Sequence, residues 1–172
     1  MTMDLTPFLP QFKLIHVLGV LAFVLVHGAS ATVALRVRSE RDGARIAALL
    51  DLSSAYQGWG WVALLVVLVS GIVGGIAGGW WTSGQLWLWA SVGVFIAITA
   101  LMTPIPTAYL NDVRHAVGMP TYNDTKKKLE PPAPVSDEEL ARILASNRPI
   151  LGAGIGLAGL AILAWLMMFK PL

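Results

Sequence analysis

Hydrophobic residues in this chain are gathered into four long runs that are separated by more polar stretches. The runs cover residues 12–36, 59–80, 85–104 and 150–169, and none shows the strict alternation of a half-buried strand. Each run is close to the roughly 20 residues that a helix needs to cross about 30 Å of hydrocarbon. The pattern predicts an all-α fold, a polytopic membrane four-helix bundle that forms a single transmembrane domain over residues 1–172.

The composition strengthens the membrane interpretation. The chain is 56% hydrophobic and 13% charged, with a mean hydropathy of +0.68, which is too apolar for an ordinary soluble domain. Strands of a membrane barrel would be shorter and would alternate polar with apolar residues. A signal peptide cleaved near Ala29-Ser30-Ala31 is a competing interpretation of the first run, but Asp4 precedes Lys13, so the leading region is not basic. We therefore expect the first run to remain as a span.

The basic residues predict the orientation in the membrane. Ten of the twelve lie in or beside two predicted loops, residues 37–58 and 111–148, whereas the connection 82–85 has no charge. Lysine and arginine in short loops are retained on the cytoplasmic side. Both loops are therefore predicted to be cytoplasmic and both termini outside, in the cell inner (plasma) membrane. Because topology explains the basic balance, we expect no nucleic-acid partner. The ten residues are Arg36, Arg38, Arg41, Arg45, Arg114, Lys126, Lys127, Lys128, Arg142 and Arg148.

Three local patterns refine this plan. Apolar residues among charges over 38–57 indicate either a short helix along the inner membrane surface or a solvated loop. Pro104 and Pro106 should kink or end the third helix, which would resume, if at all, through residues 107–117. Ser136 and Glu139 form a capping-box pattern that predicts a short cytoplasmic helix over about 137–146, before the fourth span.

Glycines at four-residue spacing occur in two of the runs. They are Gly71, Gly75 and Gly79 in the second run, and Gly152 and Gly156 in the fourth. Such spacing lets helix backbones approach closely in lipid. It is consistent with packing inside the bundle, with a contact face for a homodimer or a larger membrane complex, or with room for a flat cofactor. Membrane lipid is the other expected partner.

Two histidines are candidate ligands in the first run. His16 and His27 are 11 residues apart, which places them on one helical face but about 16 Å apart along the axis. One metal ion cannot be held by both. Ionisable residues inside membranes are often functional, and a neutral imidazole can ligate iron. We predict that His16, with His27 second, binds haem b or a similar redox ligand; a hydrogen bond between helices is the plainer alternative.

Within one chain, a second axial ligand would have to be a methionine, because no histidine lies in another span. Haem held by a single histidine, or by histidine pairs across a homodimer, is the other possibility. The remaining histidine, His115, falls in the predicted 111–148 loop. Met167 and Met168 are at about the depth of His16, and Met102 is on the inner half of the third helix. The absence of cysteine excludes iron–sulfur and thiolate sites, and no nucleotide-binding or hydrolase motif is present. No catalytic residue can be assigned.

The sequence resembles the CopD-like membrane proteins. The resemblance rests on Lys13-Leu14-Ile15-His16-Val17-Leu18-Gly19, on the exit at Arg36 and Arg38, on Arg41-Asp42, and on Gly78 to Trp81. The group includes the copper-resistance protein CopD domain, protoporphyrinogen-oxidase-like membrane proteins and, most similar here, an uncharacterised family of predicted integral membrane proteins. The protoporphyrinogen-oxidase-like branch implies haem b on His16, although the lysine that this branch uses in a later span has no counterpart here. The copper branch implies copper uptake or handling.

Three functions follow in order of preference. The first is haem-linked electron transfer or another redox role in the helix bundle. The second is a non-catalytic accessory or assembly subunit of a larger membrane complex, in which the histidines are only packed. Copper handling ranks third, because a metal pathway would need more inward-facing methionine and histidine than the sequence places there.

Overall fold

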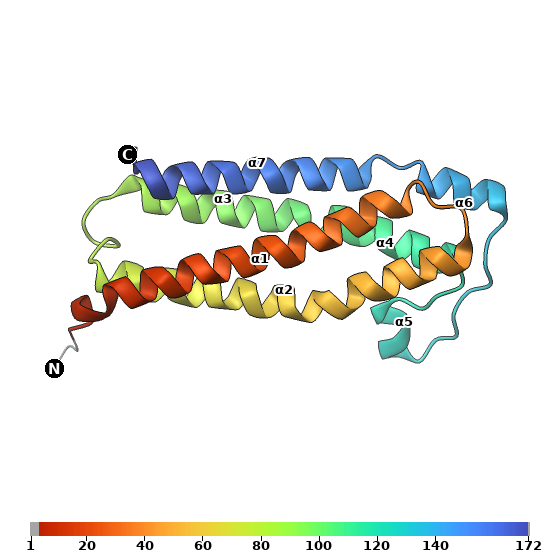
Figure 1. The fold of residues 1–172 in the computed structure, drawn as a ribbon, viewed down its shortest axis with the longest axis horizontal. Helices are drawn as coiled ribbons and strands as arrows, with labels where there is room; N and C mark the ends of the chain where they lie inside the picture. The colour runs from red at the N-terminus through yellow and green to blue at the C-terminus, as the bar shows by residue number, and fades with distance from the viewer. Residues whose placement is uncertain (1–3, 172) are drawn as a thin grey trace. The chain divides into compact units, whose positions relative to one another are not determined.

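The computed structural model describes residues 4–171, which are 79% helical and contain no strand over that range (Figure 1). A short 3-10 helix, η1 (Thr6–Phe8), leads into the first long helix. The α-helices are α1 (Leu9–Val37), α2 (Gly43–Ala77), α3 (Leu86–Met102), α4 (Pro104–Ala116), α5 (Tyr122–Lys127), α6 (Asp137–Leu144) and α7 (Arg148–Phe169).

Four helical segments are long and apolar enough to cross a membrane. They are Thr6–Val37, Gly43–Ala77, Leu86–Ala116 and Asp137–Phe169. Only 17–28% of the residues in their most apolar windows are buried within the protein, so most of this apolar surface is left for lipid. The chain is therefore a multi-pass membrane protein by the character of its helices, and these helices are compatible with a membrane helical bundle.

The helices contribute to two compact units. Unit 1 comprises Met1–Gly28, Tyr56–Ile96 and Gly159–Leu172. Unit 2 comprises Ala29–Ala55 and Ala97–Ala158. Unit 1 contains His16 and His27, whereas unit 2 contains the ten basic residues of the predicted cytoplasmic side.

Unit 2 has the more completely buried core. Its cluster includes Val37 of α1, Ile46 and Leu50 of α2, Tyr109 and Val113 of α4, and Leu144 of α6, each no more than 1% exposed. A largely buried cation links two of these helices. The Arg114 guanidinium on α4 donates to the Leu50 carbonyl at 3.0 Å and lies 3.9 Å from the Asp51 carboxylate.

Helix α2 starts within the loop predicted over residues 37–58, well before the predicted start of the second span at residue 59. It begins at Gly43 and continues without interruption to Ala77. The Asp42 carboxylate accepts from the backbone N–H groups of Ala44 and Arg45 at 2.9 and 3.2 Å, which caps the start. No proline interrupts residues 43–77, and Ile46 and Leu50 are buried in unit 2. The predicted surface helix and the second span therefore form one continuous helix, and burial of its first turns in the unit 2 core stabilises it.

The predicted break at the prolines and the predicted start of the short helix after Ser136 are confirmed. Helix α3 ends at Met102, and α4 starts at Pro104 with its prolines in the first turn, where a missing N–H leaves no internal hydrogen bond unmade. Helix α6 starts after Ser136, whose hydroxyl accepts from the Glu139 N–H at 3.4 Å. Helix α5 was not predicted, although Thr121 and Asp124 have the spacing of a capping box and form one.

Candidate functional site

The side chain of His16 on α1 contacts α2 within unit 1. Its Nδ1 atom lies 3.0 Å from the carbonyl oxygen of Val67 and 3.2 Å from the hydroxyl of Ser70. The interhelical hydrogen bond that was the plainer prediction for His16 is therefore present. His16, Val67 and Ser70 all lie well inside the long apolar helices α1 and α2.

These contacts determine which ring nitrogen carries the proton in the neutral imidazole. A carbonyl oxygen can only accept, so the contact with Val67 requires an N–H at Nδ1. The Ser70 hydroxyl has its own acceptor in the Val66 carbonyl, so it need not donate to the ring. Nε2 is then the nitrogen with the free lone pair. This is the arrangement in which a metal-ligating histidine is usually held, with the second nitrogen donating to a carbonyl.

Two glycines allow α1 and α2 to approach closely at His16. A Cβ atom on Gly71 would lie 3.1 Å from Cε1 and 3.3 Å from Nδ1 of His16. A Cβ atom on Gly19 would lie 3.0 Å from a methyl group of Val66. Both distances are tighter than ordinary contacts, so the imidazole occupies the space that the missing methyl group of Gly71 provides.

Other glycines of the predicted packing motifs are covered by side chains of the same chain. The Trp81 indole fills the space at Gly75 and donates from Nε1 to the Ile72 carbonyl at 3.2 Å. Pro106 covers Gly152 within unit 2. Gly79 instead has a φ of +65° in the turn after α2. Packing within the chain accounts for Gly71, Gly75 and Gly152, while a partner at the glycine motifs stays a prediction.

His27 has a different environment. Its ring stacks on that of Phe23, with centroids 5.4 Å apart and an interplanar angle of 11°. Within residues 4–171 its imidazole has no hydrogen-bond partner. No contact therefore fixes its tautomer, and His16 is the better positioned of the two predicted ligands.

The predicted methionine ligands lie in two separate places along the chain. Met167 and Met168 are in the last turn of α7 and are 38% and 76% exposed. Met102 is the last residue of α3 and belongs to unit 2, whereas both histidines belong to unit 1. The described part of the chain contains no group of three or more histidine, cysteine or acidic side chains able to hold a metal ion. The methionines remain predicted ligands.

An apolar groove of about 520 Å³ runs between α1 and α2 of unit 1. Gly19, Ala22 and Val26 line its α1 side, and Trp59 and Ala63 are among the residues on its α2 side. At about 100° per residue, this face of α1 is roughly a quarter turn away from the stripe of His16, Phe23 and His27. Neither His16 nor His27 therefore lines the groove, and no other titratable residue of α1 does.

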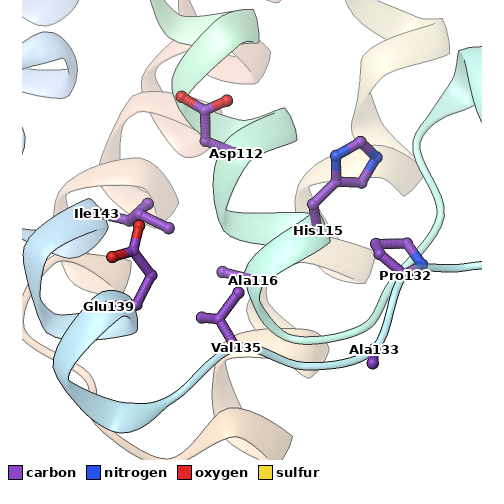
Figure 2. Close-up of a pocket in the computed structure, with 8 residues that line it drawn as sticks. All are labelled: Asp112, His115, Ala116, Pro132, Ala133, Val135, Glu139 and Ile143. Carbon is purple, nitrogen blue, oxygen red and sulfur yellow. The ribbon is translucent and has the colours of Figure 1, made fainter.

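A second cavity, of about 370 Å³, lies in unit 2 (Figure 2). Asp112 and His115 enter it from α4 and Glu139 from α6, with Pro132, Ala133 and Val135 along the loop side. Each of its titratable groups already has a partner. Asp112 pairs with Arg148 at 2.8 Å, Glu139 pairs with Arg142, and His115 Nε2 lies 2.7 Å from Asp124. The first pair connects α4 to α7 and the last connects α4 to α5, whereas Glu139 and Arg142 pair within α6. The cavity is therefore a polar junction between helices.

Asp124 is the most perturbed acid of this junction. The Thr121 hydroxyl and backbone N–H donate to its carboxylate at 2.6 and 2.8 Å, and His115 supplies a third bond. These hydrogen bonds lower the pKa of Asp124 to about 2, with the Thr121 hydroxyl as the largest cause. Because the Asp124 carboxylate caps the start of α5, this structural role accounts for its lowered pKa.

Comparison with protein-family models, with curated proteins and with solved structures found no match. The membrane class of the chain thus rests on its helices, and the CopD-like resemblance stays a prediction.

Proposed function

We propose that the protein binds haem b in the membrane through Nε2 of His16 and has a redox role. The observation that carries the proposal is the contact of His16 Nδ1 with the Val67 carbonyl at 3.0 Å. It places the proton on Nδ1 and leaves the lone pair of Nε2 for a ligand.

The residues around His16 suit a ligating imidazole. Val67 and Ser70 hold the ring from α2, and Gly71 gives it room. The helices that carry these residues are apolar. Burial in a low dielectric is one of the means by which proteins set the reduction potential of a haem. Bound haem would supply one-electron chemistry. His16 is the single histidine ligand in this proposal, since His27 is about 16 Å along the same helix.

The test is the ultraviolet–visible spectrum of gently solubilised protein, oxidised and then reduced with dithionite. We expect a Soret band that shifts on reduction and is lost in His16→Ala. His27→Ala should keep the band. Ser70→Ala removes a hydroxyl but leaves the Val67 carbonyl, so it should also retain haem. A spectrum without a Soret band, from protein expressed with ample haem, would contradict the proposal.

Two observations favour a second candidate, a non-catalytic accessory subunit of a larger membrane complex. The hydrogen bond of His16 and the aromatic side chains that cover Gly75 and Gly78 are packing contacts that need no cofactor. In that case the gently solubilised protein would lack the Soret band and would co-purify with other membrane subunits. Copper handling ranks below both, because within residues 4–171 no three histidine, cysteine or acidic side chains come together to hold a metal ion.

A further inference from the structure

Two lysines from distant parts of the chain meet at one tryptophan in unit 1. The Nζ atom of Lys13 lies 5.5 Å from the ring centroid of Trp80, and that of Lys170 lies 5.1 Å from it. Lys170 also lies 5.2 Å from the ring of Trp87. Unit 1 contains no other lysine or arginine. All of its basic side chains therefore converge on a single aromatic pair.

The aromatic pair is held firmly by its surroundings. Trp80 and Trp87 pack edge to face, with centroids 5.7 Å apart. Trp87 is only 3% exposed, and its Nε1 donates to Gln85 Oε1 at 2.7 Å. The Trp80 indole lies so close to Gly78 that a Cβ atom there would overlap it. The two rings thus form a fixed platform next to the two ammonium groups.

The cluster lies at the ends of the apolar helices. Lys13 is in the second turn of α1, Trp80 follows the end of α2 at Ala77, and Lys170 directly follows α7. Tryptophan and lysine at the ends of spans are typical of the depth of lipid headgroups. The cluster is therefore placed where a lipid phosphate would be.

The charges in the cluster are not balanced by the rest of the described chain. Neither lysine forms an ion pair within residues 4–171, and the nearest ring offers only the partial negative charge of its face. The one acidic residue of unit 1, Asp4, accepts from the Thr6 N–H at 3.0 Å. Two like charges at one ring repel each other, and an anion between them would be attracted by both.

We propose that Lys13 and Lys170, on the Trp80–Trp87 platform, form a binding site for the phosphate headgroup of an anionic phospholipid. The lysines contact the phosphate, and the indole rings set the depth at which the headgroup lies. This site is separate from His16 and does not depend on haem binding.

The test measures how added lipid shifts the melting temperature of the full chain in neutral detergent, followed by circular dichroism. Phosphatidylglycerol should raise it by several degrees, and phosphatidylcholine should raise it less. Lys13→Gln/Lys170→Gln should lose the difference between the two lipids. Lys126→Gln/Lys127→Gln is the matched control, since it removes the same charge from unit 2, and it should keep the difference.

Two further arms make the outcomes decisive. Lys13→Arg/Lys170→Arg preserves the charges and should preserve the phosphatidylglycerol effect, which separates lost binding from lost folding. Inorganic phosphate at matched concentration should give little shift; a full shift would identify a soluble anion and overturn the lipid assignment. An unchanged phosphatidylglycerol effect in Lys13→Gln/Lys170→Gln, or its loss in the arginine pair, would overturn the site.

Discussion

At the scale of single residues, His16 and Gly71 act together. The imidazole reaches the backbone of α2 only because Gly71 has no side chain in the way, and the bond to Val67 then fixes the neutral tautomer. A ligand role and a packing role therefore use the same contact. The two roles differ only at Nε2, which a ligand would occupy and packing would leave free.

Substitution of Gly71 tests this contact. The new methyl group in Gly71→Ala would lie 3.1 Å from His16 Cε1 and 3.3 Å from Nδ1, so the ring that contacts Val67 must shift by a few tenths of an ångström. We expect the free energy of unfolding to fall by about 1–3 kcal/mol, as for other overpacked sites. If haem is bound, its Soret band should also weaken or shift. Gly93→Ala is the control, because no atom lies within 4 Å of its new Cβ. It should not lower the free energy of unfolding, which it should change by less than about 1 kcal/mol, and it should leave the Soret band unchanged.

Asp124 gives a pH-dependent prediction. Its pKa of about 2 is below its ordinary value of 3.8, so its carboxylate stabilises the folded state above about pH 4. That contribution is lost as the pH falls through about 2. Asp124→Asn should therefore have a lower melting temperature than the unchanged protein at neutral pH, and the difference should shrink towards about pH 2. Melting curves over this range measure it.

The matched control for Asp124 is Glu130→Gln. Glu130 is exposed in the loop after α5 and has no hydrogen bond or ion pair within residues 4–171. It should follow the pH dependence of the unchanged protein. A constant difference between Asp124→Asn and the unchanged protein from neutral pH to about pH 2 would argue against the carboxylate as the cause.

At the scale of helices, α7 and α4 of unit 2 pack through a glycine and a proline. A Cβ atom on Gly152 would lie 2.9 Å from Cγ of Pro106, and a proline ring cannot rotate away. Gly152→Ala should lower the free energy of unfolding by about 1–3 kcal/mol. Gly154→Ala, two residues along α7, meets no atom within 4 Å and should change it by less than about 1 kcal/mol. Unfolding in sodium dodecyl sulfate, followed by circular dichroism, compares the two.

The helices could be predicted where the signal is local. Four apolar runs, the break at Pro104 and the start of α6 at Ser136 all follow from hydropathy, a missing N–H or a short-range cap. The start of α2 could not, because Ile46 and Leu50 look like a surface stripe until the α4 and α6 side chains that cover them are known. Helix α5 was a missed local signal, since Thr121 and Asp124 have the capping-box spacing.

The candidate site was only partly predictable. Position along the first run was enough to single out His16 and His27, but not to rank them by contact. The ranking depends on Val67 and Ser70, which are more than 50 residues away and carry no motif. The Lys13, Lys170 and Trp80 cluster has the same origin, because it joins residues from opposite ends of the chain.

At the scale of the whole molecule, the two units differ in charge. Unit 2 holds ten of the twelve basic residues, and unit 1 holds Lys13 and Lys170. The positive-inside rule therefore predicts that the 111–148 loop is cytoplasmic and that the α2–α3 connection is outside. This orientation also decides which leaflet would supply the lipid of the lysine site.

The chain has no cysteine, so single-cysteine variants can report its orientation without background. Ser83 is exposed in the α2–α3 connection, and Glu130 is exposed in the loop between α5 and α6. In whole cells, a membrane-impermeant maleimide should label Ser83→Cys, and it should label Glu130→Cys only after the membrane is permeabilised. The reverse pattern would invert the topology. The lysine site would then face the cytoplasmic leaflet, where anionic lipid is abundant, and the ten basic residues would have to be held outside against the charge rule.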